Sequence, residues 1–153
     1  MILNLERDLE RSDILDLQDW ARKVSGKSRL TIEMDREFES GAWVWKDRRR
    51  KPVIHLGEKG CFSNKHTVVA AMGLLLHEIG HLMGNRFSGR TIHREFGAEL
   101  WAIQMASKTG MEFVLRFMKS TMRRELCSPP MASFNQNLYR QVYILLHDHG
   151  IVG

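Results

Sequence analysis

Cysteines and long apolar runs are both scarce in this sequence. Only two of the 153 residues are cysteine, Cys61 and Cys127, which is too few for a disulfide framework and is typical of a reducing compartment. The longest apolar stretch, residues 68–76, is shorter than the roughly 18 residues that a membrane-spanning helix needs. The N-terminus has no basic region followed by an apolar one, so no signal peptide is expected. These absences predict a cytoplasmic protein with no membrane partner.

The overall composition is that of an ordinary globular protein. A hydrophobic fraction of 43% and a charged fraction of 27% exclude a disordered tail, a collagen-like fibre and a coiled coil. No repeat or long linker divides the chain, so we expect residues 1–153 to form a single domain. The net charge of +5 permits weak association with an anionic partner but does not require one.

The spacing of apolar residues predicts one helix, then three strands, then four helices. The expected helices cover residues 12–24, 64–83, 91–108, 111–126 and 133–147, and the expected strands cover residues 30–34, 42–46 and 52–56. Ser63 or Asn64 is the expected N-cap of the long central helix, and a loop is expected at residues 84–90. A charged turn separates the last two strands, which predicts a hairpin. This order predicts an α+β fold with segregated parts.

The central helix carries a His-Glu-x-x-His motif, from His77 to His81. Residues four apart differ by only about 40° around a helix, so both imidazoles project from one face. They can therefore bind one Zn²⁺ at about 2.0–2.1 Å. Glu78 lies about 100° around the helix from His77, where it can act on a metal-bound water instead of the metal. The alternative is a pair of hydrogen-bonded core histidines with a surface glutamate.

The next expected helix offers two carboxylates, Glu95 and Glu99, which are four residues apart and share a face. A catalytic zinc normally has three protein ligands and an open position. Thirteen residues separate His81 from Glu95, enough for a turn and a helix that returns past the metal. One carboxylate can bind the metal while the other hydrogen-bonds a ligand histidine. Gly97 and Ala98 would permit close approach of the two helices, although an ordinary charged helix face is the alternative.

These residues together resemble the gluzincin clan of zinc metallopeptidases. The two motifs, at residues 77–81 and 95–99, look like those of the minigluzincins and of the catalytic core of the membrane-bound heat-shock-type peptidases. By that resemblance the zinc ligands would be His77, His81 and Glu95, and the general base would be Glu78. Glu99 would be the carboxylate that orients a ligand, at a position where the family favours aspartate.

A weaker resemblance is to the phage and mobile-element peptidases that cleave repressors, because residues 98–102 echo their Ala-x-x-aromatic-Ala helix. Both resemblances imply a minimal zincin-like domain, with a short sheet packed on the His-Glu-x-x-His helix and a helical C-terminal half. They imply a zinc-dependent endopeptidase that acts on a protein or peptide substrate. Two alternatives stay open. One is a structural or virion-associated zinc protein without peptidase activity, and the other is a nucleic-acid-associated zinc protein.

Other residues admit two interpretations each. The strand at 52–56 stands where zincins place the edge strand that pairs with substrate, although an internal strand is also consistent with its pattern. The segment 43–51 interleaves aromatic and cationic residues, as single-strand nucleic-acid sites do, although a solvated hairpin turn with packed tryptophans is the simpler interpretation. Cys127 is either a zinc thiolate or a free buried cysteine. The donor that polarises the scissile carbonyl is left open among His93, Tyr139, Tyr143 and His147.

Overall fold

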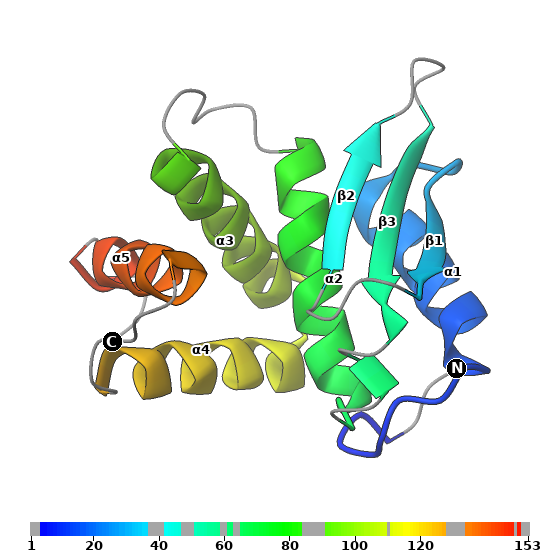
Figure 1. The fold of residues 1–153 in the computed structure, drawn as a ribbon, viewed down its shortest axis with the longest axis horizontal. Coiled ribbons are helices and arrows are strands. Elements are labelled where there is room, and N and C mark those ends of the chain that lie inside the picture. The colour runs from blue at the N-terminus through cyan, green and yellow to red at the C-terminus, as the bar shows by residue number, and fades with distance from the viewer. Residues whose placement is uncertain are drawn as a thin grey trace.

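The fold consists of one helix, a small sheet and a group of four further helices (Figure 1). The computed structural model describes residues 4–36, 42–46, 51–58, 61–62, 65–83, 91–109, 111–127, 134–148 and 150, so the loop expected at residues 84–90 lies outside it. The elements are α1 (Asp13–Ser25), β1 (Thr31–Asp35), β2 (Ala42–Lys46), β3 (Pro52–Gly57), α2 (Val68–Met83), α3 (Thr91–Lys108), α4 (Glu112–Cys127) and α5 (Phe134–Asp148). This is the predicted order, and it gives an α+β fold.

The sheet has the strand order β1-β3-β2. The predicted hairpin is confirmed, because β2 pairs antiparallel with β3 and places Val44 opposite Ile54. β1 pairs in parallel with the other side of β3, with Ile32 opposite Ile54. Of the two interpretations of residues 52–56, the edge strand is therefore wrong and the internal strand is confirmed, since β3 is bonded on both sides. The alternation of apolar and polar residues within one strand does not show which distant strand pairs with it. The parallel partner of β3 is β1, which precedes the hairpin in the sequence.

The free edge of β1 is occupied by side chains from α1. The Gln18 carbonyl oxygen accepts a hydrogen bond from the backbone N–H of Ile32 at 3.0 Å. The Arg22 guanidinium donates to the backbone carbonyl of Leu30 at 2.7 Å. Side chains that use the main-chain groups of an edge strand prevent another strand from pairing there. Of the two outer strands, β2 is therefore the one that remains available on its outer side in the described part of the chain.

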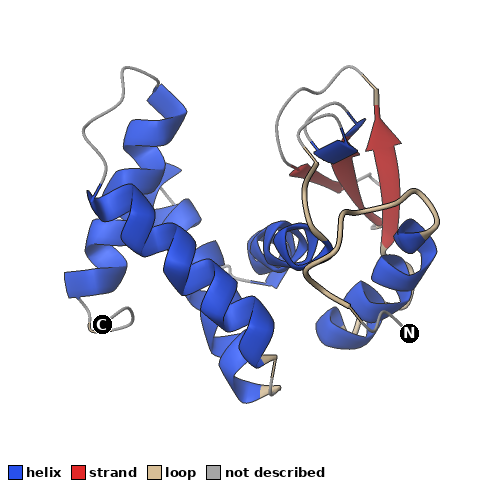
Figure 2. Ribbon diagram, turned by 90° about the horizontal axis from the view of Figure 1, so that it is seen from below, coloured by secondary structure: helices blue, strands red, loops and turns tan. Residues whose placement is uncertain are grey.

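α2 runs through the middle of the molecule. Thirteen of its sixteen residues are buried, because α1 and the sheet lie on one side of it and α3 and α4 on the other (Figure 2). The core on the sheet side is formed by alternate strand residues and by one face of each helix. It includes Leu17, Ala21, Ile32, Ile54, Leu56, Leu75 and Ile79. None of the described helices combines the length and the apolar character needed to cross a membrane.

α2 begins later than the sequence predicts. Its first residue is Val68, and the Thr67 hydroxyl accepts a hydrogen bond from the backbone N–H of Ala70 at 3.2 Å, which is the geometry of an N-cap. The predicted caps, Ser63 and Asn64, lie outside the described residues. Thr67 also pairs with Asp8 in an isolated β-bridge, so tertiary contact fixes the start of this helix.

The chain near the N-terminus completes this cap with its own backbone. The N–H of Val68 donates to the carbonyl of Arg7 at 3.0 Å, and the N–H of Val69 donates to the carbonyl of Leu5 at 2.8 Å. The first turn of a helix leaves N–H groups without partners inside the helix. Here the segment from Leu5 to Leu9 supplies hydrogen-bond acceptors for these N–H groups, so the first donors of α2 are satisfied where the helix enters the core.

Candidate metal centre

α2 and α3 touch closely at one point. A Cβ atom placed on Gly80 would lie 2.4 Å from the carbonyl oxygen of Ala98 and 2.9 Å from its Cα. Only glycine therefore fits at this position in the His-Glu-x-x-His motif. The sequence predicts close approach from Gly97 and Ala98, and the structure adds that the facing residue is Gly80. This contact brings the carboxylates of α3 against the histidines of α2.

Three donor atoms from the two helices converge beside this contact. Nε2 of His77 lies 2.7 Å from Oε2 of Glu95 and 3.1 Å from Nε2 of His81. Nε2 of His81 lies 3.2 Å from the same Oε2 of Glu95. Within the described part of the chain, these three residues are the one group of histidine, cysteine and carboxylate side chains that could hold a metal ion.

The donor set fits a divalent cation of the zinc type. A tetrahedral zinc with bonds of about 2.0–2.1 Å holds its ligand atoms about 3.3 Å apart. The three separations in the protein, 2.7, 3.1 and 3.2 Å, are slightly shorter, so a small expansion would accommodate the ion. Two imidazole nitrogens and one carboxylate oxygen are ligands that zinc commonly takes.

Glu99 contacts the opposite side of the His77 ring. Its Oε1 forms a short hydrogen bond with Nδ1 of His77, and both residues are buried. A carboxylate only accepts hydrogen bonds, so Nδ1 carries the proton. In a neutral imidazole, Nε2 then has the free electron pair that a metal needs. The structure therefore places Glu99 at Nδ1 of His77 and Glu95 among the three atoms that could bind a metal, so the two carboxylates have different positions.

Glu78 is buried in α2 next to His77, and only 8% of its surface is exposed. Among the described residues it has neither a hydrogen bond nor an ion pair. Burial is the main reason that its pKa rises to about 6, while the nearby charges of His77 and His81 act in the opposite direction. A carboxylate without a hydrogen-bonding partner, with a pKa close to neutral, is suited to accept and return a proton.

Three convergent donors, beside a carboxylate that has no hydrogen-bonding partner among the described residues, are thus the feature of this structure that bears most directly on function. No protein-family model, curated protein or solved structure matches the chain. The chemistry of the site therefore has to follow from these side chains and from their surroundings.

The histidines and carboxylates of the site also shift one another's pKa. Burial alone would lower the pKa of His77, but the charge of Glu99 and the hydrogen bonds with Glu95 and Glu99 outweigh it, so the pKa lies well above 6.5. Burial would raise the pKa of Glu95, but the hydrogen bonds from His77 and His81 lower it to about 2. Without a metal, His77 is therefore protonated at neutral pH and Glu95 is ionised.

Metal binding is expected to displace this proton. Because His77 can ligate only after losing it, binding near pH 7 should release about one proton per ion, and affinity should fall about tenfold for each pH unit below the pKa of His77. Calorimetric titrations with zinc in two buffers of different ionisation enthalpy measure the release. An affinity that stays constant between about pH 6 and 8 would contradict a ligand role for His77.

Three of the four expected carbonyl-polarising residues have described side chains, and none of these three takes part in the hydrogen bonds and ion pairs of the donor group described above. His93 is exposed on the first turn of α3, and His147 is exposed with its Nδ1 3.8 Å from Oδ1 of Asp148. Tyr143 is half-buried on α5, which packs on α3 and α4. The side chain of Tyr139 lies outside the described residues.

Cys61 does not belong to the donor group in the described part of the chain. Cys61 is buried, and burial raises the pKa of its thiol to about 11. It is therefore a neutral thiol at neutral pH, which is a poor metal ligand. The side chain of Cys127 lies outside the described residues, so its expected choice between zinc thiolate and buried cysteine stays a prediction.

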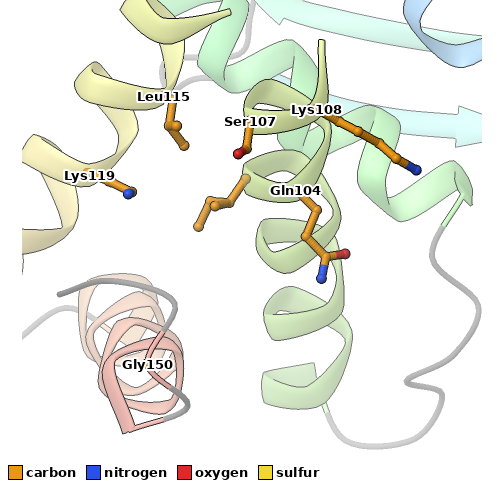
Figure 3. A pocket seen from close by; sticks show the side chains of 7 residues that line it. Gln104, Ser107, Lys108, Leu115, Lys119 and Gly150 are labelled. Carbon is orange, nitrogen blue, oxygen red and sulfur yellow. The ribbon is translucent and has the colours of Figure 1, made fainter. Parts of the chain in front are cut away.

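A surface pocket of about 610 Å³ lies elsewhere, between the C-terminal half of α3, α4 and Gly150, which lies beyond the end of α5 (Figure 3). Its walls include Ile103 and Ser107 from α3, with Leu115 and Lys119 from α4. It shares no residue with the donor group. Sequence patterns did not predict this pocket, because it arises where three helices meet and no motif marks its walls.

Proposed function

We propose that this chain is a zinc-dependent endopeptidase with a minimal zincin-like, gluzincin-related fold. The observation that carries the proposal is the buried carboxylate of Glu78, which makes no hydrogen bond with a described residue and stands next to the donor group. A structural zinc site uses four protein ligands, whereas a catalytic site uses three. The described residues supply three, which favours the enzyme over a structural or virion-associated zinc protein.

Each residue of the site has a separate task in the proposed reaction. His77, His81 and Glu95 would hold the ion, and Glu99 fixes the ring of His77 through Nδ1. Zinc, when bound, lowers the pKa of a water toward about 7 and polarises the scissile carbonyl. The carboxylate of Glu78 takes the proton of the attacking water and later delivers it to the leaving amine. The products are a carboxylic acid and an amine.

The sheet supports an extended peptide as the substrate. β2 packs against α2, the helix that carries both histidines, and its outer edge is the one that α1 does not cover. An extended chain can add to such an edge through main-chain hydrogen bonds, with little dependence on its own sequence. The proposed substrate strand therefore lies along residues 42–46, and not along residues 52–56 as the sequence suggested.

Zinc content and hydrolysis measured together test the proposal. The protein purified without added zinc or chelator is expected to contain about one zinc per chain and to cleave an unfolded protein substrate. Removal of the metal with a chelator should abolish cleavage, and one equivalent of zinc should restore it. A protein that holds zinc but cleaves nothing across a broad peptide library would favour the structural zinc protein.

The two carboxylates of α3 are expected to differ in their effect on zinc affinity. Glu99→Gln should weaken binding by about 10–100-fold, the usual cost of losing a group that orients a ligand. Glu95→Gln removes a charged donor and should weaken it by more than about 100-fold. Titration against a chromophoric chelator measures both, with Glu112→Gln on the exposed face of α4 as the control. The reverse order would mean that the two roles are exchanged.

A reducing compartment, the cytoplasm, is the proposed location. The low cysteine content, two residues in 153, supports it, because small proteins of oxidising compartments more often carry a disulfide framework.

A further inference from the structure

The positive charge of this protein is concentrated in two short segments. Residues 22–29 contain four cations and no carboxylate, and residues 46–51 contain five cations and one carboxylate. Their combined net charge of +8 exceeds the net charge of the whole chain, +5, so the remaining residues are net negative. The net positive charge of the protein therefore comes from these two segments.

The parallel pairing of β1 with β3 brings the two segments together. The first segment leads into Thr31, and the second leads into Pro52 and Val53. Since Thr31 lies opposite Val53, the approaches to both strands reach the same end of the sheet (Figure 1). Lys23, Arg29 and Lys51 are exposed there and Lys27 is half-buried; these four residues are called the basic end. The connection at residues 47–50 lies outside the described residues and is not part of this definition.

The opposite end of the sheet has a different character. Asp35 ends β1 there, and Glu58 follows β3 and forms ion pairs with Arg11 and Arg36. A strand of five residues is about 16 Å long, about twice the Debye length of about 8 Å at physiological salt. The carboxylates at that end therefore do little to neutralise the basic end.

The strand register places two aromatic positions of β2 on one face of the sheet, next to the basic end. Trp43 lies opposite His55 and Trp45 opposite Val53, and alternate residues of a strand share one face. Ile54 and Leu56, which alternate with Val53 and His55 along β3, are buried in the hydrophobic core, so the tryptophan positions belong to the other face of the sheet. Clustered cations beside aromatic positions on a sheet are what single-stranded nucleic acids need, because the bases stack and the phosphates are neutralised.

We infer that the basic end and the adjoining face of the sheet bind single-stranded nucleic acid. Phosphates would contact Lys23, Lys27, Arg29 and Lys51, and bases would stack beside Val53 and His55. The surface shares no residue with the metal centre, so the inference does not depend on the proposed peptidase activity. The sequence pattern suggested a nucleic-acid site at the hairpin. The proposed surface also includes the loop between α1 and β1.

Fluorescence anisotropy with a labelled 16-nucleotide oligothymidylate tests the inference. The affinity is expected to fall steeply with salt. Each contacted phosphate should add about 0.7 to the magnitude of the slope of the logarithm of the binding constant against the logarithm of the salt concentration. The double variant Lys27→Ala/Arg29→Ala should weaken binding at least tenfold and reduce the slope by about 1.4. The matched control, Lys108→Ala/Arg116→Ala, removes one lysine and one arginine from α3 and α4, and it should leave both values unchanged.

A polyglutamate peptide of equal charge separates nucleic acid from an acidic protein partner. The oligonucleotide should bind at least tenfold more tightly, and its binding should quench tryptophan fluorescence because the bases stack. Equal affinity for polyglutamate without quenching would overturn the inference and point to an acidic protein. Weak binding that is independent of salt, or equal loss in both double variants, would also overturn it.

Discussion

Glu78→Gln is expected to abolish peptide hydrolysis while leaving the zinc content and the fold intact. The substitution keeps the size of the side chain and removes only its ability to take a proton. General-base catalysis contributes about 10²–10⁴-fold, so the rate should fall by at least two orders of magnitude. Parallel measurements of zinc content, circular dichroism and cleavage of an unfolded substrate show whether catalysis alone is lost.

The same variant carries a second signature. Because burial raises the pKa of Glu78 from 4.5 to about 6, the ionised side chain destabilises the metal-free fold as the pH rises through this range. Glutamine removes that cost, roughly 2 kcal/mol at pH 7, so the metal-free variant should unfold at a higher temperature than wild type at pH 7 and not at pH 4. Glu112→Gln, which alters an exposed carboxylate, serves as the control. Wild-type cleavage rates in Glu78→Gln would refute the mechanism.

Gly80→Ala should disable the metal centre without changing any donor atom. Its Cβ would lie 2.4 Å from the carbonyl oxygen of Ala98, a backbone atom that cannot turn aside, so α2 and α3 have to separate. Glu95 and Glu99 would then move away from His77. We expect the zinc affinity to fall by more than about 100-fold, because donors are displaced on both sides of His77, and the stability to fall by about 1–3 kcal/mol.

Gly73→Ala is a matched control two turns earlier in the same helix. A Cβ at Gly73 would lie 3.6 Å from Cδ1 of Phe117, which is an ordinary contact. Alanine is favoured over glycine inside a helix, so this variant should gain about 0.5–1 kcal/mol and bind zinc like wild type. Thermal unfolding and zinc titration of the two variants measure the difference. Equal behaviour would show that the contact at Gly80 does not position the carboxylates.

Local patterns predicted most of the elements because periodicity reports local structure. The helix expected at residues 12–24 is found at Asp13–Ser25, and the strand expected at residues 42–46 agrees in both limits. The predicted start of α2 was wrong because the first N–H groups of this helix donate to the carbonyls of Leu5 and Arg7, which are distant in sequence. Whether residues 52–56 form an edge or an internal strand was left open for the same reason, since the parallel partner of β3 is not its neighbour along the chain.

The candidate site was likewise predictable from local patterns only in part. Helical spacing places His77 and His81 on one face, and Glu95 and Glu99 on one face, without any knowledge of the tertiary fold. Helical spacing does not show which carboxylate lies next to Nε2 of His77 and which lies next to Nδ1. That depends on the position of α3 along the axis of α2. The contact at Gly80 fixes this offset, and nothing local marks that glycine as different from Gly73.

The main-chain bonds at the start of α2 have a consequence for folding and for sequence drift. The carbonyls of Leu5 and Arg7 reach N–H groups more than sixty residues away in sequence, so this junction closes a long loop and is expected to form late in folding. Any amino acid supplies such a carbonyl. Positions 5 and 7 can therefore change without loss of these bonds, whereas proline at Val69 would remove a donor that the helix uses on entering the core.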